Sequence, residues 1–164
     1  MSGTGTPQLQ PAELTHLRTT AADLRVAIVA SRWHETVMDG LITGAERFLN
    51  QVSPAEVNIY RAPGSFELPV ISAHAVEHHE AVIALGVVIR GGTPHFEYVC
   101  QAATDGLASL AVTSRTPIGF GLLTCDTEDQ ALARAGLAGS TEDKGFEAAH
   151  AAIAAAAEIA RVTA

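Results

Sequence analysis

The chain has 164 residues, 48% of them hydrophobic, and a formal net charge of −8 at pH 7. This length corresponds to one domain, which can bury about 70% of its unfolded surface and needs no disulfide or metal to hold a core. The negative charge, with no cluster of Lys or Arg, argues against nucleic acid or an anionic membrane as a partner, because binding either starts from a basic patch. A single anionic metabolite remains compatible, since it needs only one or two local positive groups.

Three further features bear on cell compartment. Cys100 and Cys125 are too few and too far apart for a disulfide framework or a C-x-x-C motif. The opening segment MSGTGTPQLQPAEL lacks the basic start and the apolar stretch of a signal peptide. The longest apolar run, around Ala81–Ile89, is far shorter than a membrane span. We therefore expect a cytoplasmic protein.

Regular structure is predicted from residue 23 onward. Residues 1–22 are rich in Thr, Gly, Pro and Gln without sustained periodicity, which predicts a flexible arm, ordered only against a neighbour, to whose sheet it can add. Residues 23–164 then form a single domain. Leu24–Ser31 is an apolar, β-branched run typical of a strand buried on both faces. Thr36–Asn50 has helical spacing, with an apolar stripe made by Val37, Leu41, Ala45, Phe48 and Leu49.

The alternation of strands and helices continues to the end of the chain. In order, the remaining predicted elements are strand Glu56–Arg61, helix Ser65–His79 with Ser65 as its N-cap, strand Ala81–Ile89, helix Pro94–Thr113, strand Pro117–Thr124, short helix Thr127–Ala135, and Ala-rich helix Thr141–Val162. This order predicts an α/β fold. We expect a three-layer αβα sandwich of the flavodoxin-like kind, built on a four-stranded parallel sheet with right-handed crossovers.

Open parallel sheets bind ligands at the carboxyl ends of their strands, which singles out the loops at 32–34, 63–67, 90–95 and 125–126. The third loop, RGGTPH, is the richest. Gly91 and Gly92 allow a close approach of backbone to ligand, Thr93 can cap the next helix, and Pro94 fits its first position. Free N–H groups at such a helix start form a natural phosphate cradle, although many glycine turns only connect elements.

Three side chains each have a functional and a structural interpretation. His95, in the first turn of that helix, can be a neutral proton acceptor, although an isolated histidine more often caps a helix or packs at a surface. Trp33, the only tryptophan, can stack on a flat heterocycle or cover the core. Arg134 ends a short helix, where it can clamp a phosphate with paired hydrogen bonds or simply complement the helix dipole.

Four segments in this order resemble the 6,7-dimethyl-8-ribityllumazine synthase family: VAIVASRWH at 26–34, RAPGSFELP at 61–69, ALGVVIRGGTPHFEYVC at 84–100 and TEDQALARAG at 127–136. The similarity runs from about Arg25 to the C-terminal helix, and 84–100 is its most specific stretch. The resemblance implies a transferase for the penultimate step of riboflavin biosynthesis. It would condense 5-amino-6-(D-ribitylamino)uracil with 3,4-dihydroxy-2-butanone 4-phosphate and release phosphate, with no metal or organic cofactor.

The resemblance also implies a role for individual residues. Trp33 would stack on the pyrimidine ring, while Ser65, Phe66 and Glu67 would hold the ribityl side. The backbone of Val88 and Ile89 would read the edge of the ring.

On the phosphate side, Gly92 and Thr93 would cradle the phosphate, Arg134 would clamp it, and His95 would move protons. The site would lie between subunits of a homo-oligomer, a pentamer or a multiple of it. Phe120, Arg134 and Lys144 would then come from a neighbouring subunit.

Some positions depart from the family pattern. His34 stands where Asn is frequent, and Ala133 replaces an acidic residue often found before the arginine. The connection Gly136–Lys144 is longer than the tight turn of capsid-forming members, which favours a pentamer over an icosahedral shell.

Two alternatives belong to other functional classes. His74, Glu77 and His78 match the H-x-x-E-H pattern of a zinc peptidase. That segment runs directly into a predicted buried strand and marks out no third ligand, so a solvated helix face is favoured. The second alternative is a non-catalytic binder of flavins or lumazines. The pairing of His95 with Arg134 favours catalysis, because a carrier needs no proton shuttle beside a phosphate clamp.

Overall fold

The computed structural model describes residues 9–164. Its core is a four-stranded sheet in the order β2-β1-β3-β4. The strands are β1 (Arg25–Ser31), β2 (Glu56–Ala62), β3 (Ala81–Ile89) and β4 (Ile118–Cys125), and all three pairings are parallel. The predicted parallel sheet is confirmed, and each predicted strand end lies within one residue of the observed one.

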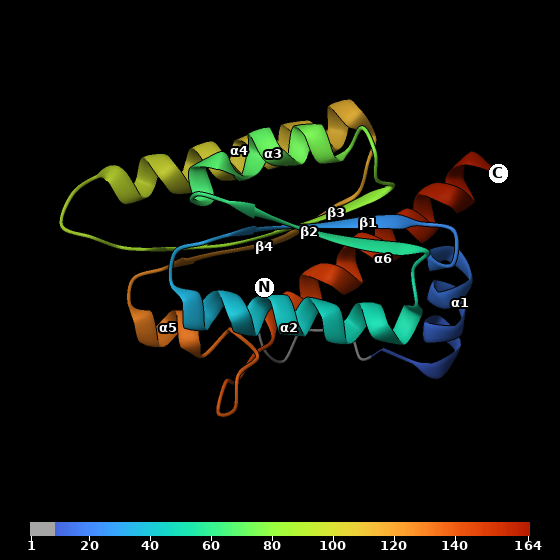
Figure 1. Cartoon of the computed structure of the whole chain (residues 1–164), viewed down its shortest axis with the longest axis horizontal. Coiled ribbons are helices and arrows are strands. Elements are labelled where there is room, and N and C mark those ends of the chain that lie inside the picture. The colour runs from blue at the N-terminus through green and yellow to red at the C-terminus, as the bar shows by residue number, and fades with distance from the viewer. Residues whose placement is uncertain (1–8) are drawn as a thin grey trace.

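Helices cover both faces of this sheet, as predicted. They are α1 (Pro11–Ala21), α2 (Glu35–Val52), α3 (Leu68–Ala75), α4 (His95–Ser114), α5 (Glu128–Leu132) and α6 (Lys144–Thr163), with a short 3₁₀ helix η2 (Ser65–Glu67) before α3. Figure 1 shows α3 and α4 over one face and α2, α5 and α6 over the other. Within residues 9–164, no helix combines the length and the apolarity that crossing a bilayer requires.

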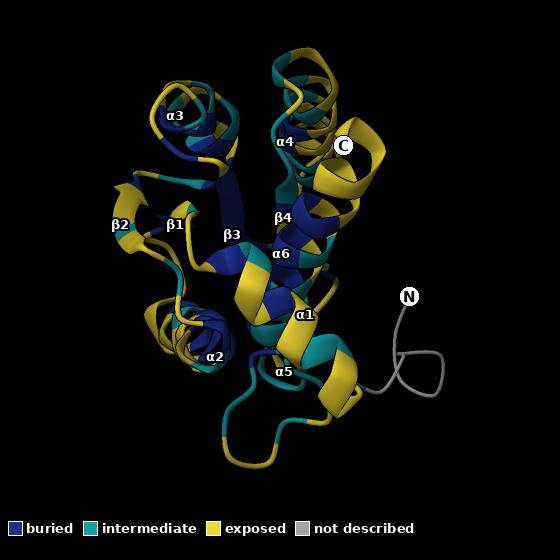
Figure 2. Cartoon of the chain, turned by 90° about the vertical axis from the view of Figure 1, so that its right-hand side faces the viewer, coloured by how far each residue is buried: buried dark blue, intermediate teal, exposed yellow. Residues whose placement is uncertain are grey.

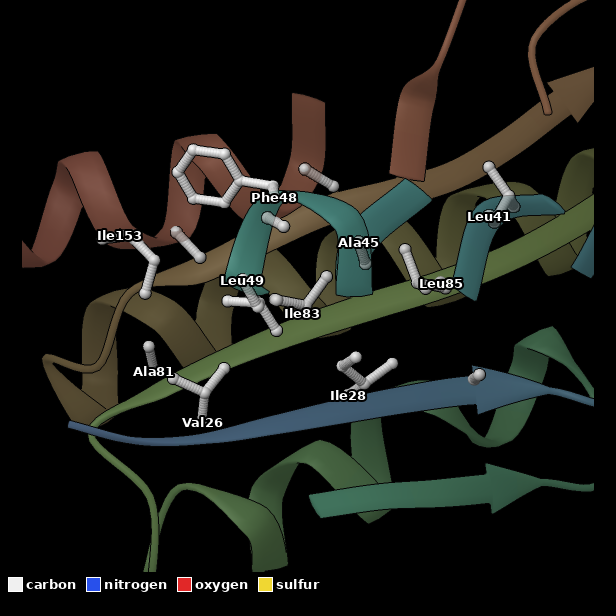
Figure 3. Close-up of a cluster of buried hydrophobic side chains, with 14 of the residues drawn as sticks. Val26, Ile28, Leu41, Ala45, Phe48, Leu49, Ala81, Ile83, Leu85 and Ile153 are labelled. Atoms are coloured by element: carbon white, nitrogen blue, oxygen red, sulfur yellow. The ribbon is translucent and has the colours of Figure 1, made fainter. Parts of the chain in front are cut away.

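The two faces of the sheet bury alternate residues, as the period of a strand demands. In β1, Val26 and Ile28 join the core under α2 and α6, whereas Ala27 and Val29 join the smaller core under α3 and α4. Figure 3 shows Phe48 and Leu49 of α2 and Ile153 of α6 gathered over the first of these faces. The predicted stripe of α2 is buried throughout. Figure 2 shows the contrast between the buried β3 and the exposed edge strand β2.

The N-terminal region differs from the predicted arm without regular structure. Pro11 begins helix α1, whose Leu17 and Ala21 are buried against the main core. The guanidinium of Arg18 also donates to the carbonyl of Gln51 at the end of α2, with Nε and O 2.6 Å apart. The helix was missed because its Thr-rich sequence has low helix propensity and places few apolar residues on its buried side. The sequence also predicts that the N-terminal arm adds to the sheet of a neighbouring copy. That prediction includes residues 1–8, which lie outside the described residues.

The helix predicted at Ser65–His79 is shorter in the structure and begins later. Ser65 does not cap a helix: it lies inside η2, and helix α3 ends at Ala75, short of the predicted His79. The carbonyl of Ala75 accepts from the N–H of His78, which turns the chain toward β3. Both ring nitrogens of the buried His79 have partners, the carbonyl of Ala75 at 2.8 Å and Oδ1 of Asn58 at 2.9 Å.

The elements after β4 are shorter than predicted. Helix α5 ends at Leu132, so Arg134 lies just beyond it. Helix α6 begins at Lys144 instead of the predicted Thr141, because Asp143 caps it by accepting from the N–H of Phe146. Residues 133–143 therefore form a loop between α5 and α6, and this loop contains Arg134.

Candidate active site

A cavity of about 650 Å³ lies at the carboxyl ends of the strands. It lies between β1 and β3, which are neighbours in the sheet. The chain leaves β1 toward β2 at one edge of the sheet and leaves β3 toward β4 at the opposite edge. Open α/β sheets bind ligands at such a switch point. The cavity brings together seven of the predicted site residues: Trp33, Ser65, Phe66, Glu67, Val88, Ile89 and His95.

Two glycines make room for the polar part of this cavity. The hydroxyl of the buried Ser65 donates to the carbonyl of Val87 at 3.2 Å. A Cβ on Gly86 would lie 2.8 Å from that hydroxyl oxygen, and a Cβ on Gly64 would lie 3.1 Å from Oε2 of Glu67. Glycine at both positions therefore lets the segment after β2 fold closely over the end of β3, which fixes Ser65 and Glu67 at the cavity wall.

Two aromatic side chains are exposed at the same cavity. Trp33 is 68% exposed and Phe66 is 59% exposed, and both line the cavity wall. Trp33 is therefore no cover for the core, and its ring is accessible to a flat ligand. Beside it, His34 has a left-handed backbone with φ of 59°. Asn and His tolerate this conformation better than most side chains, which gives a physical reason why His can stand where Asn is frequent.

His95 is the first residue of α4, and its side chain lines the cavity. Pro94 occupies the N-cap position, and no side chain caps this helix start. The predicted capping by Thr93 and first helical position for Pro94 are therefore wrong. A Cβ on Gly91 or Gly92 would meet no atom within 4 Å. Neither Gly92 nor Thr93 lines the cavity, so this exposed loop has open space around it.

Arg90 anchors this loop, a role that sequence reasoning missed. Its Nε donates to Oδ1 of Asp126 at 2.7 Å, it pairs with Glu97, and its guanidinium lies 4.2 Å from the ring centre of Phe96. The hydrogen bond from Arg90 holds the pKa of the Glu97 carboxyl below its ordinary value. These contacts join the end of β3, the first turn of α4 and the loop after β4. The motif VIRGG contained the residue but gave no sign of its partners.

A second cavity, also of about 650 Å³, runs along β4 at the edge of the sheet. Phe120, Arg134 and Lys144 line it, together with residues of β4 and α6. It shares no lining residue with the first cavity. Within the described part of one chain, the predicted site residues therefore fall into two groups, and Gly92 and Thr93 line neither cavity.

The connection between α5 and α6 places the two cations of this second cavity side by side. Ala135 and Asp143 form an isolated antiparallel bridge, and the N–H of Lys144 donates to the carbonyl of Arg134 at 3.0 Å. The guanidinium of Arg134 donates to the carbonyl of Gln130 at 2.9 Å, at the end of α5. The arginine thus serves the helix end, as its structural interpretation expects, and lines the cavity as well.

Two carboxylates accompany these cations. Oε2 of Glu142 lies 2.7 Å from Nζ of Lys144, and Oε1 of Glu142 lies 3.9 Å from Nη2 of Arg134. Glu147 lies on the other side of Lys144, with 2.6 Å between Oε2 and Nζ. Burial lowers the pKa of Lys144, but the hydrogen bonds that Lys144 donates to Glu142 and Glu147 outweigh burial, so the pKa is raised overall. The lysine therefore carries a full positive charge.

Other chemistries find little support at these sites. Burial raises the pKa of both the Cys100 and the Cys125 thiols, so neither is an activated nucleophile. Across residues 9–164 there is no group of three or more His, Cys, Asp or Glu side chains placed to hold a metal ion. Of the H-x-x-E-H residues, only His74 lies in α3, while Glu77 and His78 lie in the turn that follows. They lack the single helical face that a zinc peptidase needs.

Comparison with known proteins identifies the family. The family described as 6,7-dimethyl-8-ribityllumazine synthase matches residues 23–160. A protein of that name from Kocuria rhizophila is 57% identical over 153 residues, covering 93% of this chain and 95% of its own length. One from Streptomyces coelicolor is 53% identical over 164 residues, covering 99% of this chain and 98% of its own. One from Cutibacterium acnes is 61% identical over 131 residues, covering 80% and 79%. The chain belongs to the 6,7-dimethyl-8-ribityllumazine synthase family.

Proposed function

We propose that this chain catalyses the formation of 6,7-dimethyl-8-ribityllumazine and that each active site combines residues of two neighbouring copies. The observation that carries the proposal is the division of the site residues between two cavities. His95 and the aromatic wall lie in one, whereas Arg134, Lys144 and Phe120 lie along the edge strand β4. A cavity at an edge strand is accessible to a second copy, and a ring of copies would join the two kinds of cavity at every contact.

The substrates under this proposal are 5-amino-6-(D-ribitylamino)uracil and 3,4-dihydroxy-2-butanone 4-phosphate. Trp33 offers an exposed ring for stacking on the uracil. Ser65, Phe66 and Glu67 lie where the ribityl side chain can bind, and Val88 and Ile89 line the same cavity, where their backbone would read the edge of the ring. The open loop at Gly92 and Thr93 of one copy would meet Arg134 of the next around the phosphate. A guanidinium suits this role because it forms paired hydrogen bonds with phosphate oxygens.

Under this proposal, most of the acceleration of the reaction comes from aligning the two substrates. Amines attack ketones readily, and holding the two substrates in register contributes roughly 7–11 kcal/mol. His95 would then move protons during the condensation, the loss of phosphate and the closure of the ring, contributing about 10²–10⁴-fold. No step in this scheme needs a metal or an organic cofactor.

The first test is direct. Mixing both substrates with the purified protein should yield the fluorescent lumazine product, whereas a non-catalytic flavin binder would yield none. A mass measurement of the particle gives the number of copies, for which we propose a pentamer or a multiple of it.

The sharper test concerns the shared site. The phosphorylated ketone is supplied far below the concentration that saturates Arg134→Ala, so that each variant alone is nearly inactive. Co-refolding His95→Ala with Arg134→Ala in equal amounts should then restore activity, because in a mixed ring about a quarter of the contacts unite an intact His95 with an intact Arg134. Each variant refolded alone is the control. A mass measurement verifies that the particles contain both variants. If such mixed particles are no more active than the average of the two variants, a site built from two copies is ruled out.

A further inference from the structure

The two cations that line the cavity along β4 are balanced by two neighbouring carboxylates. Arg134 and Lys144 supply two positive charges, and Glu142 and Glu147 supply two negative ones. Three ion pairs link these four side chains to one another. The four side chains therefore sum to no net charge. A dianion approaching Arg134 meets a neutral cluster instead of a cationic one, which weakens the attraction between them.

Glu142 is the more buried of the two carboxylates in this cluster. Its side chain is 12% exposed, and it does not line the cavity, so it stands behind the two cations. Its backbone is held on both sides: its N–H donates to the carbonyl of Ala133 at 3.0 Å, and its carbonyl accepts from the N–H of Gly136 at 3.1 Å. Glu147, in contrast, lines the cavity from α6.

We propose that Glu142 is a positioning residue that acts through Lys144 and Arg134: as a fixed counter-charge beside both cations, it limits the affinity of the site for phosphate. This inference rests on the proposed function. The reaction takes in a phosphate ester and releases inorganic phosphate, and the same cations face both. A site with an unopposed pair of cations would retain the released phosphate and be inhibited by it. Glu142 makes the phosphate bind weakly enough to leave.

The proposal predicts a direction that a purely structural role does not. Glu142→Gln keeps the shape of the side chain and removes its charge, which leaves the cluster with one net positive charge. A unit charge several ångströms from a dianion, partly screened by solvent, changes affinity by about tenfold. Inorganic phosphate should therefore bind Glu142→Gln about tenfold more tightly than it binds the unaltered protein. A residue that merely supports the fold would weaken phosphate binding when changed.

The experiment is calorimetric titration of the assembled protein with inorganic phosphate, paired with phosphate inhibition of lumazine formation. Tighter binding and a lower inhibition constant in Glu142→Gln, with near-original affinity in Glu142→Asp, would support the proposal. Glu158→Gln is the matched control, since it removes the same charge from an exposed pair elsewhere on α6. Equal or weaker phosphate binding by Glu142→Gln would overturn it. If that variant does not fold, Glu142→Ser carries the same test with the same two outcomes.

A further variant separates this inference from the proposed function. Arg134→Ala should weaken phosphate binding if the arginine is the clamp. If Arg134→Ala leaves phosphate affinity unchanged, the clamp itself fails. If Arg134→Ala weakens binding but Glu142→Gln does not tighten it, the clamp stands and only the role of Glu142 is wrong.

Discussion

The backbone N–H of Lys144 donates to the carbonyl of Arg134 at 3.0 Å, so main-chain hydrogen bonding holds these two cations side by side. The contact depends on the connection between α5 and α6, which folds back through the bridge between Ala135 and Asp143. The backbone of this connection therefore sets the spacing of the two residues, while both of their cationic groups also lie beside the Glu142 carboxylate.

Arg134→Ala tests the clamp in turnover. We expect KM for the phosphorylated ketone to rise by about 10–100-fold, since charge-assisted hydrogen bonds contribute about 1.5–3 kcal/mol, while KM for the uracil changes little. Arg134→Lys should recover part of the loss, because it keeps the charge without the paired geometry. Steady-state kinetics with each substrate varied in turn measures both values. Equal increases in the two KM values would point instead to a general collapse of the cavity.

His95→Ala tests the assignment of most of the rate to alignment. We expect kcat to fall by about 10²–10⁴-fold, because the variant loses proton transfer but keeps the substrates in register. The control is His74→Ala, since His74 is exposed on α3 and lines neither cavity. Complete loss of activity in a folded, assembled His95→Ala protein would contradict this division of roles.

The first cavity was predictable because its residues follow from a rule about parallel sheets. Trp33 follows β1, Ser65 follows β2 and His95 follows β3, so locating the buried strands locates these side chains. The strands themselves were predictable because a buried run such as Ala81–Ile89 has few alternatives.

The contacts of the charged residues could not be predicted in the same way. Arg90 with Asp126, and Glu142 with Arg134, depend on how separate connections fold over one another. No local pattern marks such pairs. The resemblance to the family pointed to Arg134 and Lys144, but not to the carboxylate behind them.

Trp33 provides a binding signal, since it is the only tryptophan in the chain. Its ring is 68% exposed, so its emission should resemble that of a solvated indole and be quenched when a flat heterocycle stacks on it. Titrating the protein with the lumazine product, with excitation chosen to avoid the product's own absorption, measures the quenching. Trp33→Phe should retain most of the activity because it keeps a stacking ring. Emission that is unchanged at saturating product would place the ligand away from Trp33.

Gly145→Ala tests the packing that positions Lys144. A Cβ at this position would overlap the backbone carbonyl of Leu41, so α6 would have to move away from α2. We expect a loss of about 1–3 kcal/mol in the free energy of unfolding, the usual cost of overpacking. Gly91→Ala is the matched control, because a Cβ there meets nothing within 4 Å. Denaturant unfolding of both variants measures the difference, and equal stability would show that α2 and α6 adjust freely.

Glu80→Gln tests a pH-dependent contact at the start of the sheet. The Glu80 carboxylate accepts from the backbone N–H of Arg25 at 2.8 Å and pairs with its guanidinium at 2.6 Å. The hydrogen bond from the Arg25 side chain is the main cause that holds the pKa of Glu80 below its ordinary value of 4.5. Because the pKa is lower in the folded state, the stabilisation is present above about pH 4.5 and is lost as the pH falls through the lowered value.

The Tm of Glu80→Gln should therefore lie a few degrees below that of the unaltered protein at pH 7, and the gap should close on acidification below pH 4.5. Glu158→Gln is the control, since its ion pair is more exposed (73% and 62%, against 49% and 41% for Arg25 and Glu80) and such pairs contribute little. Scanning calorimetry between pH 7 and about pH 3 measures the Tm of each variant relative to that of the unaltered protein. A gap for Glu80→Gln that stayed constant down to pH 3 would mean that the shape of the side chain, rather than its charge, joins the starts of β1 and β3.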